Sequence, residues 1–399
     1  MFRRDSLSSF ALTFALAATP ALAQEPAEPT PAAAQDTQSV IKDLMQRVEK
    51  LEGAPAKAGL NSFNPAIGMA LDGAFRDSND KAAFQFRAAE LNIEAPVDPY
   101  LKAWAVITGS NGGVDVEEAA LETTSLPYNL TIRGGRLFAN FGRLAHFHDH
   151  ELPVVDRPLS LDSYVGGETQ ADGVETQWLV PVPFYLNATA GAYNKMGANN
   201  ARQNNQGARA LDEFTYLGRV NTYADLTDSQ NVELGVDSAW TPKRTVAPVS
   251  PGPTTRQNTW RTLTGLDLTY RYQPTGGGLY HGMIWGTEVL QNDERRFDPA
   301  TNLPTGRVRA YSGYSYVEVK SGLHLREGVM ADLTEDQDIA RKLTSTYTGF
   351  LTYDVSEFQR VRLTYATAIT NVAGTPRNHT VALQWTGVIG HHVHGFRDR

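Results

Sequence analysis

The feature that most constrains the fold of this chain is a regular alternation of apolar and polar residues over long segments. In residues 259–272, one face carries mainly aromatic, leucine and threonine side chains, and the other includes Arg261, Asp267, Thr269 and Arg271. A period of two is the pattern of a β-strand, whose successive side chains point to opposite faces. An apolar band that ends in aromatic residues, opposite a charged row, is typical of a strand between lipid and a polar lumen.

The same alternation recurs in residues 230–241 and 358–367 and along most of the chain from Ala66 onward. A soluble β-sandwich would bury its apolar face and would rarely oppose it with charges so regularly. We therefore predict an all-β fold, a transmembrane antiparallel β-barrel of about 16 strands. The strands are expected near residues 66–75, 84–95, 101–108, 114–123, 128–138, 173–180, 184–193, 214–224, 230–241, 259–272, 279–291, 307–319, 322–330, 343–353, 358–368 and 379–390.

The connections between these segments alternate in length, and this alternation predicts the topology. Every second connection is tight, such as residues 97–99, 181–183 and 320–321, whereas most of the others are longer and polar. Outer-membrane barrels alternate short periplasmic turns with longer external loops in this way. We therefore predict a multi-pass barrel over residues 60–399 in a bacterial outer membrane, with both termini in the periplasm.

The N-terminal residues indicate export. Residues 1–23 combine two arginines, a short apolar run and the cleavage motif Ala21-Leu22-Ala23, which together predict a signal peptide. Residues 24–38 are rich in proline and alanine and are expected to form a disordered linker. No later stretch approaches ~20 apolar residues, so no transmembrane helix is expected.

Residues 39–53 show the a/d spacing of a coiled coil. Ile41, Leu44, Val48 and Leu51 follow one another at intervals of three, four and three residues. A helix of about two heptads is too short to be stable alone, so it needs support from an oligomer. We predict a short coiled-coil helix that assists a homo-oligomer, most simply a trimer. The alternative is an amphipathic helix that lies on the protein's own surface.

Composition limits the partners of this chain. It contains no cysteine, so disulfides do not stabilise it, and it carries a net charge of −8, which argues against nucleic acid as a partner. Aromatic residues make up 10% of the chain although its mean hydropathy is −0.35, a combination that fits alternating barrel strands. The expected partners are outer-membrane lipid and small hydrophilic solutes or ions.

The longest connection, residues 139–172, organises the functional prediction. A loop of this length in a compact protein is usually functional, and apolar residues within it need a surface to pack on. We predict that it is the third external loop and that it folds into the lumen, where it narrows the pore. Its apolar anchors are Leu144, Phe147, Leu152, Val154, Val155, Leu159, Leu161 and Tyr164.

Charged residues in and just before this loop are the candidate pore constriction. Charges of both signs at a constriction create a transverse field that selects solutes by charge and size. The alternative is that ion pairs only pin the loop to the wall. The mixture of signs indicates no anion preference. The candidates are Arg133, Arg136, Arg143, His146, His148, Asp149, His150, Glu151, Asp156 and Arg157.

His146, His148 and His150 occupy alternate positions and form a candidate metal site. In an extended segment their imidazoles project to one side and could converge on zinc, with Asp149 or Glu151 orienting them. The alternative is that these groups hydrogen-bond the loop to the barrel wall. Zinc is the one cofactor that the sequence suggests. Three further histidines are expected in a solvated C-terminal tail: His391, His392 and His394.

With these residues in view, the run IRGGRLFANFGR at residues 132–143 resembles the corresponding region of the phosphate-selective porin O/P family. Those proteins are similar in having an N-terminal coiled coil, a 16-stranded barrel and a trimeric state. The chain also resembles uncharacterised proteobacterial outer-membrane proteins, often labelled zinc-regulated or TonB-dependent receptors. The shared motifs are Val97-Asp98-Pro99-Tyr100, Val116-Glu117-Glu118-Ala119, Phe141-Gly142-Arg143, His148-Asp149-His150-Glu151-Leu152-Pro153, Val155-Asp156-Arg157-Pro158 and Gly390-His391.

The TonB-dependent label fits the sequence poorly. Such receptors resemble 22-stranded barrels filled by a folded plug, and the roughly 35 residues between Gln24 and the first expected strand are too few for a plug. The phosphate specificity of the porin O/P family is likewise not expected here, because charges of both signs line the predicted constriction.

No catalytic signature is present: the chain has no G-x-S-x-G, no P-loop and no H-E-x-x-H motif, so we do not expect an enzyme. The favoured function is a porin-like channel for passive diffusion of small hydrophilic solutes. The alternative is an outer-membrane receptor or channel for a metal ion, zinc, or its chelate, which would use the loop histidines. A structural barrel without transport is the third hypothesis.

Overall fold

The structure is a computed structural model that describes residues 65–79, 81–200, 210–246, 255–257, 259–297 and 304–390. The predicted signal peptide, linker and coiled-coil helix therefore lie outside the described residues, as does the C-terminal histidine set. Within the described ranges, no helix is long and apolar enough to cross a membrane.

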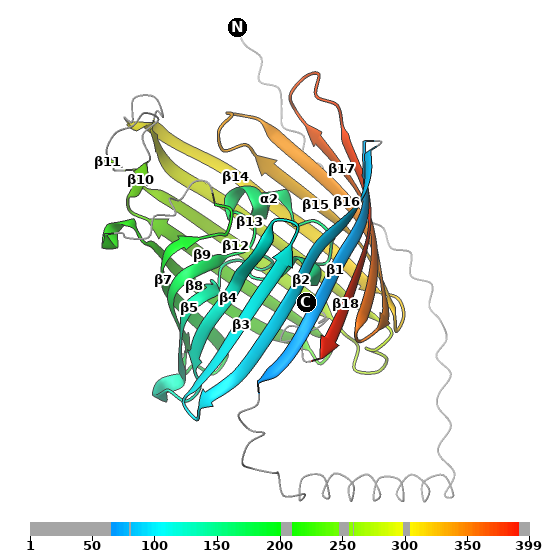
Figure 1. Ribbon diagram of the computed structural model, residues 1–399, viewed down its shortest axis with the longest axis horizontal. Coiled ribbons are helices and arrows are strands. Elements are labelled where there is room, and N and C mark those ends of the chain that lie inside the picture. Colours follow the sequence, from blue (N-terminus) through cyan, green and yellow to red (C-terminus); the bar gives the residue numbers. More distant parts are fainter. Residues whose placement is uncertain are drawn as a thin grey trace, which may run out of the picture. The chain divides into compact units, whose positions relative to one another are not determined.

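Sixteen strands form one closed barrel in which every neighbouring pair is antiparallel, so the predicted fold class is confirmed (Figure 1). Strand β1 pairs with both β2 and β18, and this second pairing closes the ring. Strands β10 (Arg244–Val246) and β11 (Thr255–Gln257) form a separate two-stranded sheet in the connection between β9 and β12. The barrel strands are β1 (Ala66–Ser78), β2 (Lys81–Asp98), β3 (Leu101–Ser110), β4 (Gly113–Thr123), β5 (Leu130–Phe138), β6 (Gln170–Leu179), β7 (Tyr185–Met196), β8 (Thr215–Thr227), β9 (Gln230–Thr241), β12 (Arg261–Tyr272), β13 (Gly282–Phe297), β14 (Pro304–Lys320), β15 (Leu325–Glu335), β16 (Leu343–Ser356), β17 (Gln359–Thr370) and β18 (Asn378–Gly390).

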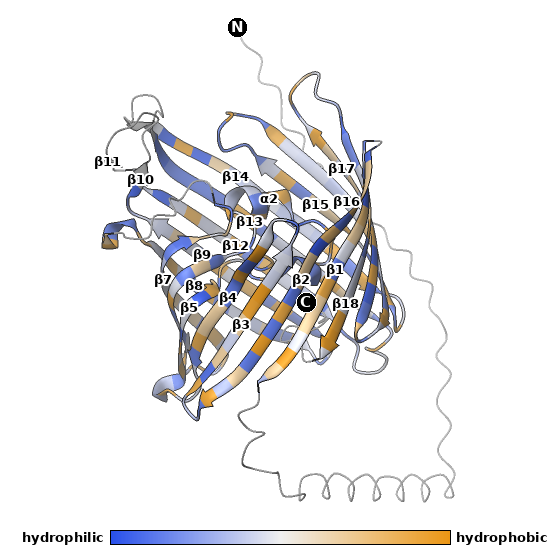
Figure 2. Cartoon of the chain, in the orientation of Figure 1, coloured by the Kyte–Doolittle hydropathy of each residue, from blue (hydrophilic) through white to orange (hydrophobic). Residues whose placement is uncertain are grey.

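The alternation read from the sequence separates the two faces of the wall. In β12, Leu263 and Asp267 are buried, whereas Leu266 between them is 54% exposed. Leu266 lies across from Val236 on β9 and Val289 on β13, which are 54% and 53% exposed. The outer face is therefore a continuous apolar surface across neighbouring strands, and Figure 2 shows hydrophobic and hydrophilic residues alternating along them.

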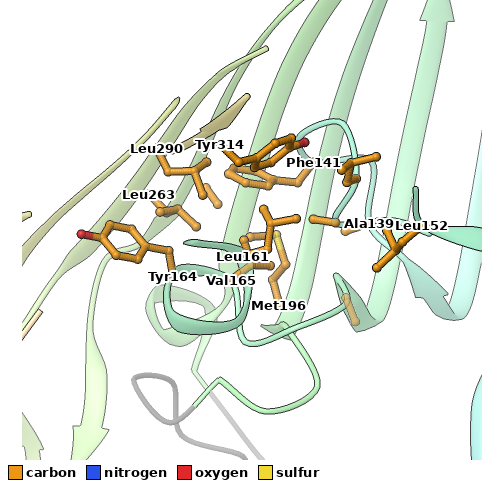
Figure 3. Close-up of a cluster of buried hydrophobic side chains, with 14 of the residues drawn as sticks. Ala139, Phe141, Leu152, Leu161, Tyr164, Val165, Met196, Leu263, Leu290 and Tyr314 are labelled. Carbon is orange, nitrogen blue, oxygen red and sulfur yellow. The ribbon is translucent and has the colours of Figure 1, made fainter. Parts of the chain in front are cut away.

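The inner face carries apolar as well as polar residues, so the expectation of a polar lumen holds for only part of the wall. The inner row of β12 includes Leu263, which the sequence reading of that face left out. Apolar side chains from eleven strands meet loop residues in one buried cluster, part of which Figure 3 shows. Burying one such side chain stabilises the packed state by about 1.5–3 kcal/mol. The wall contributes Ala120, Leu137, Ala171, Tyr193, Met196, Leu217, Ala239, Leu263, Ile284, Leu290, Ala310, Tyr314, Tyr316, Met330 and Phe350.

Strand β5 ends at Phe138 and β6 begins at Gln170, so their connection is residues 139–169, which we call the inner segment. It is three residues shorter than predicted because residues 170–172 pair with β5. The inner segment contains a 3-10 turn, η3 (Asp149–Glu151), and a short helix, α2 (Leu159–Tyr164). Helix α2 contacts β13, β14 and β15.

Candidate functional site

The inner segment leaves the wall through a tight turn at Gly142. This residue has a φ of +65°, in the left-handed region that favours glycine, and a Cβ there would collide with the carboxylate of Glu288 on β13. Glu288 Oε2 accepts the backbone N–H of Arg143 at 3.2 Å. Glu175 Oε2 on β6 accepts the backbone N–H of Asn140 at 2.9 Å. Two wall glutamates thus satisfy backbone donors that would cost about 1–3 kcal/mol each if buried without a partner.

Helix α2 is held by the opposite wall. The backbone N–H of Ser160 donates to Asp332 Oδ2 on β15 at 3.0 Å, and Tyr164 Oη donates to the carbonyl of Glu335 on the same strand at 3.0 Å. Arg261 Nη2 on β12 donates to the carbonyl of Tyr164 at 2.6 Å. In the ring of sixteen strands, β5 has the fifth place and β15 the thirteenth, so the two are eight strands apart. The inner segment therefore reaches from one side of the barrel to the other.

A third group of contacts holds the inner segment to β1, β2 and β17. Asp156 pairs with Arg76 on β1 and lies 3.6 Å from Arg87 Nη1 on β2. Arg87 Nη2 also donates to the carbonyl of Val155 at 2.9 Å. Arg362 on β17 donates to another backbone carbonyl of the segment at 3.4 Å. These contacts place the predicted constriction residue Asp156 in an anchoring ion pair.

Arg157 fixes the shape of the inner segment from within. Its guanidinium donates to the carbonyls of Leu144 at 3.0 Å and Phe147 at 2.6 Å. It also pairs with Asp149 at 2.9 Å and Glu168 at 3.2 Å. Burial on its own lowers the pKa of Arg157, but these carboxylates outweigh burial and raise the pKa above its ordinary value. All four partners of Arg157 lie in the inner segment, so these contacts stabilise the shape of the segment and do not attach it to the wall.

The other predicted arginines also pair locally. Arg133 pairs with Glu175 on the adjacent strand β6, and Arg136 pairs with Asp172 across the same strand pair at 2.7 Å. Arg143 donates to Tyr316 Oη on β14 at 2.9 Å. The structure therefore distributes these arginines over several wall contacts and does not gather them into one ring.

His148 and His150 are buried side by side against wall carboxylates. Their ring centroids are 5.8 Å apart. His150 Nδ1 lies 3.1 Å from Glu90 Oε1 on β2, and His148 Nδ1 lies 3.3 Å from Glu117 Oε2 on β4. Burial alone would lower the pKa of each histidine, but the facing carboxylates outweigh burial and raise both pKa values, that of His148 well above its ordinary range. The facing carboxylates therefore favour the protonated form of both imidazoles.

The predicted trio of histidines assumed an extended segment, and the structure does not have one there. Residues 149–151 form η3, and the backbone N–H of His148 donates to Glu151 Oε2 at 3.2 Å at the start of this turn. The ring of His146 packs on Phe147, with centroids 4.4 Å apart. Among the described residues, the ligand atoms that converge are those of His148 with two wall glutamates, and not those of three histidines.

A cavity of about 490 Å³ lies between the inner segment and strands β1 to β4. Of the predicted constriction residues, Asp149, His150 and Arg157 line it, and the side chain of Asp149 is 50% exposed. Six carboxylates face two guanidinium groups in the lining, so the cavity is acidic. The charged lining residues are Asp72, Arg87, Glu90, Glu117, Asp149, His150, Arg157, Asp162 and Glu168.

The sequence reading missed the wall partners of the inner segment. The missed charged residues are buried or largely buried and lie on three strands: Arg87 and Glu90 on β2, Glu175 on β6 and Glu288 on β13. A signal for them exists, because each is a charged residue within a barrel strand. Their partners in the inner segment could not be inferred. The alternation along a strand shows which face a residue is on, but it does not show which loop residue contacts it inside the barrel.

Comparison with known proteins supports the fold. No family model matches the chain. The solved structures that it resembles include an anion-selective porin from Comamonas acidovorans, with 12% identity, a TM-score of 0.56 and coverage of 82% of this chain and 99% of the porin. The outer-membrane channel DcaP of Acinetobacter baumannii gives 11% identity and a TM-score of 0.56, with coverage of 84% and 99%. A trimer form of OmpT from Vibrio cholerae gives 11% identity and a TM-score of 0.51, with coverage of 81% and 99%.

One curated relative, an uncharacterised protein of Aquifex aeolicus, is 28% identical over 307 residues. This match covers 71% of the present chain and 63% of the relative. The structural likeness to these proteins shows a shared porin-like fold and nothing further, because the sequence identities are only 11–12%. The likenesses do not support the label of a zinc-regulated receptor.

Proposed function

We propose that this protein is an outer-membrane channel for passive diffusion of small hydrophilic solutes, narrowed by its inner segment. The observation that carries the proposal is the reach of residues 139–169 across a closed porin-like barrel, from Glu175 on β6 to Asp332 on β15. A segment held on opposite walls divides the lumen and leaves solutes a smaller passage. The acidic cavity beside it supplies a hydrated, charged path of the kind that small solutes use.

Cysteine chemistry tests this proposal directly, because the chain has no cysteine of its own. Asp149→Cys places a thiol in the cavity, and Asp228→Cys places one in the exposed β8–β9 turn. Under the proposal, a bulky cationic thiol reagent lowers the conductance of Asp149→Cys in planar bilayers and leaves Asp228→Cys unchanged. Equal conductance of modified and unmodified Asp149→Cys would place the solute path elsewhere.

Deletion gives a second readout. Removing residues 144–165 should raise single-channel conductance severalfold if the barrel assembles, since the bridge across the lumen is lost. Removing the exposed residues 372–375 between β17 and β18 is the matched control and should leave conductance unchanged. Heat-modifiable migration in detergent gels identifies the variants that have folded.

We further propose that the barrel resides in the outer membrane with periplasmic termini, and that residues 39–53 assist a trimer. The trimer form of Vibrio cholerae OmpT shares this barrel fold, which makes such an assembly reasonable. Crosslinking of a variant with Ile41, Leu44, Val48 and Leu51 changed to serine should show weakened assembly. An unchanged oligomer would mean that the helix does not hold the assembly together.

Uptake of a metal ion or its chelate is the second candidate function. It is favoured by Glu90, Glu117 and His150, which line the cavity beside His148. Conductance that depends on added zinc, lost when His148 is replaced, would support uptake over the passive channel. A conductance that is the same with and without zinc would support the passive channel.

A further inference from the structure

Three potential metal ligands from three separate elements meet where the inner segment touches the wall. His148 Nδ1 lies 3.6 Å from Glu90 Oε2 on β2 and 3.3 Å from Glu117 Oε2 on β4. The three ligand atoms all lie within 4.8 Å of one another. His148 and Glu90 are buried, and Glu117 is partly buried. This set differs from the three histidines that the sequence suggested, since two of its members belong to the barrel wall.

The spacing of these atoms fits a tetrahedral ion. Zinc binds imidazole nitrogen and carboxylate oxygen at about 2.0–2.2 Å, so two ligands of a tetrahedral site are roughly 3.3–3.5 Å apart. The two measured distances from His148 Nδ1 are close to that range. Two of the three ligand pairs are thus near tetrahedral spacing, and the third pair, between Glu90 and Glu117, lies within 4.8 Å.

We propose that Glu90, Glu117 and His148 bind one divalent transition-metal ion of the zinc type. A mixed nitrogen and oxygen set suits zinc, cobalt or nickel, whereas calcium and magnesium prefer oxygen ligands alone. Glu90 and Glu117 line the cavity, so an ion can enter from it and a water molecule can take the fourth position.

The groups around the three ligands are those that orient a metal site. Thr108 Oγ1 donates to Glu117 Oε2. His150 Nδ1 lies 3.1 Å from Glu90 Oε1. The other carboxylate oxygen of Glu90, Oε2, is the one near His148. On the far side of the imidazole, His148 Nε2 faces Glu118 Oε2 at 3.9 Å. This separation is longer than a hydrogen bond, so the carboxylate acts on the ring through its charge.

The consequence is a metal crosslink between the inner segment and the wall. Strands β2 and β4 each supply one carboxylate, and His148 comes from the start of η3. The ion would hold the inner segment near Asp149 and His150, two residues of the segment that line the cavity. The site does not require that the barrel conduct any solute, so its test is separate from that of the proposed channel.

Zinc binding by the purified full chain tests the proposal. The protein is prepared without a tag, stripped with chelator, and carries glutamine at the C-terminal histidines 391, 392 and 394 so that these cannot contribute. Isothermal titration with zinc should give one ion per barrel with micromolar or tighter affinity. The variants His148→Gln and Glu117→Gln should each bind more than about 100-fold more weakly, beyond the 10–100-fold loss that is typical of outer-shell changes.

His146→Gln is the matched control, because this histidine lies two residues away in the same segment and outside the converging set. It should bind zinc as the parent does. Cobalt provides a readout that needs no variant to fold: the parent protein should show the visible absorption bands of a tetrahedral site, abolished by zinc but not by magnesium. Absence of stoichiometric zinc binding, or undiminished binding by folded His148→Gln, would overturn the proposal.

Discussion

Replacing Leu161 by alanine tests whether apolar packing holds the inner segment in place. Leu161 lies in α2, its side chain is 0% exposed, and it belongs to the buried cluster that includes Leu263 and Leu290 of the wall (Figure 3). Its truncation leaves a void inside the barrel and removes contacts from the segment, while the outer face of the wall is untouched. The effect should therefore be local to α2.

The expected magnitude follows from the burial. Truncating a fully buried leucine to alanine costs about 2–5 kcal/mol, depending on how far the site collapses. Since about 1.4 kcal/mol corresponds to a factor of ten, the ratio of undocked to docked inner segment should rise roughly 30-fold to several-thousand-fold. Leu211→Ala is the matched control, because Leu211 is 76% exposed and the same truncation there removes little packing.

Hydrogen exchange in nanodiscs measures this ratio. The backbone N–H groups of Val165 and Gly166 donate to the carbonyl of Leu161 at 2.9 and 3.1 Å, so their exchange reports the opening of α2. Leu161→Ala should accelerate exchange of both amides by at least about 30-fold and leave the β12 amides unchanged. Exchange equal to that of Leu211→Ala would refute the reasoning, since polar anchors alone would then hold the segment.

Three further outcomes follow from the described contacts. Gly142→Ala should weaken docking of the inner segment by about 1–3 kcal/mol in the same exchange measurement, because the φ of +65° and the nearby Glu288 both disfavour a side chain at this position. Gly218→Ala is the control and should have little effect, since the space around Gly218 is open. Arg87→Gln should shift the ion selectivity of the channel toward cations, measured by reversal potential, since it removes one of two guanidinium groups from an acidic cavity. In the presence of chelator, raising the pH from 6 to 9 should lower the exchange protection factors of residues 148–152, that is, their exchange rates relative to unstructured peptide at the same pH. The pKa of His150 is raised in the folded state, so its contribution to docking is complete below its ordinary pKa of about 6.5 and is lost as the pH rises through the folded value.

Much of the barrel could be predicted from the sequence, because strand alternation is a local property. The row from Leu266 to its neighbours Val236 and Val289 faces outward as the period of two requires. Counting the alternating segments predicted about 16 strands, and the connection lengths identified the connection between β5 and β6 as the longest.

The candidate site could be predicted only in part, because its contacts join distant parts of the chain. The sequence identified His148 and Arg143, but their partners Glu117 and Tyr316 lie on strands whose depth and register no local pattern reveals. The convergence of three histidines rested on an extended backbone, and the 3-10 turn η3 redirects the chain there.

The anchors of the inner segment also determine when it can reach its place during biogenesis. The contact between Arg143 and Tyr316 spans 173 positions of the chain, and that between Val154 and Arg362 spans 208. Contacts of such high order form slowly, since a long loop must close before they provide any stabilisation. Tyr164 likewise remains without its partners Arg261 and Glu335 until β12 and β15 have been made, and the nascent chain needs protection from aggregation during that interval.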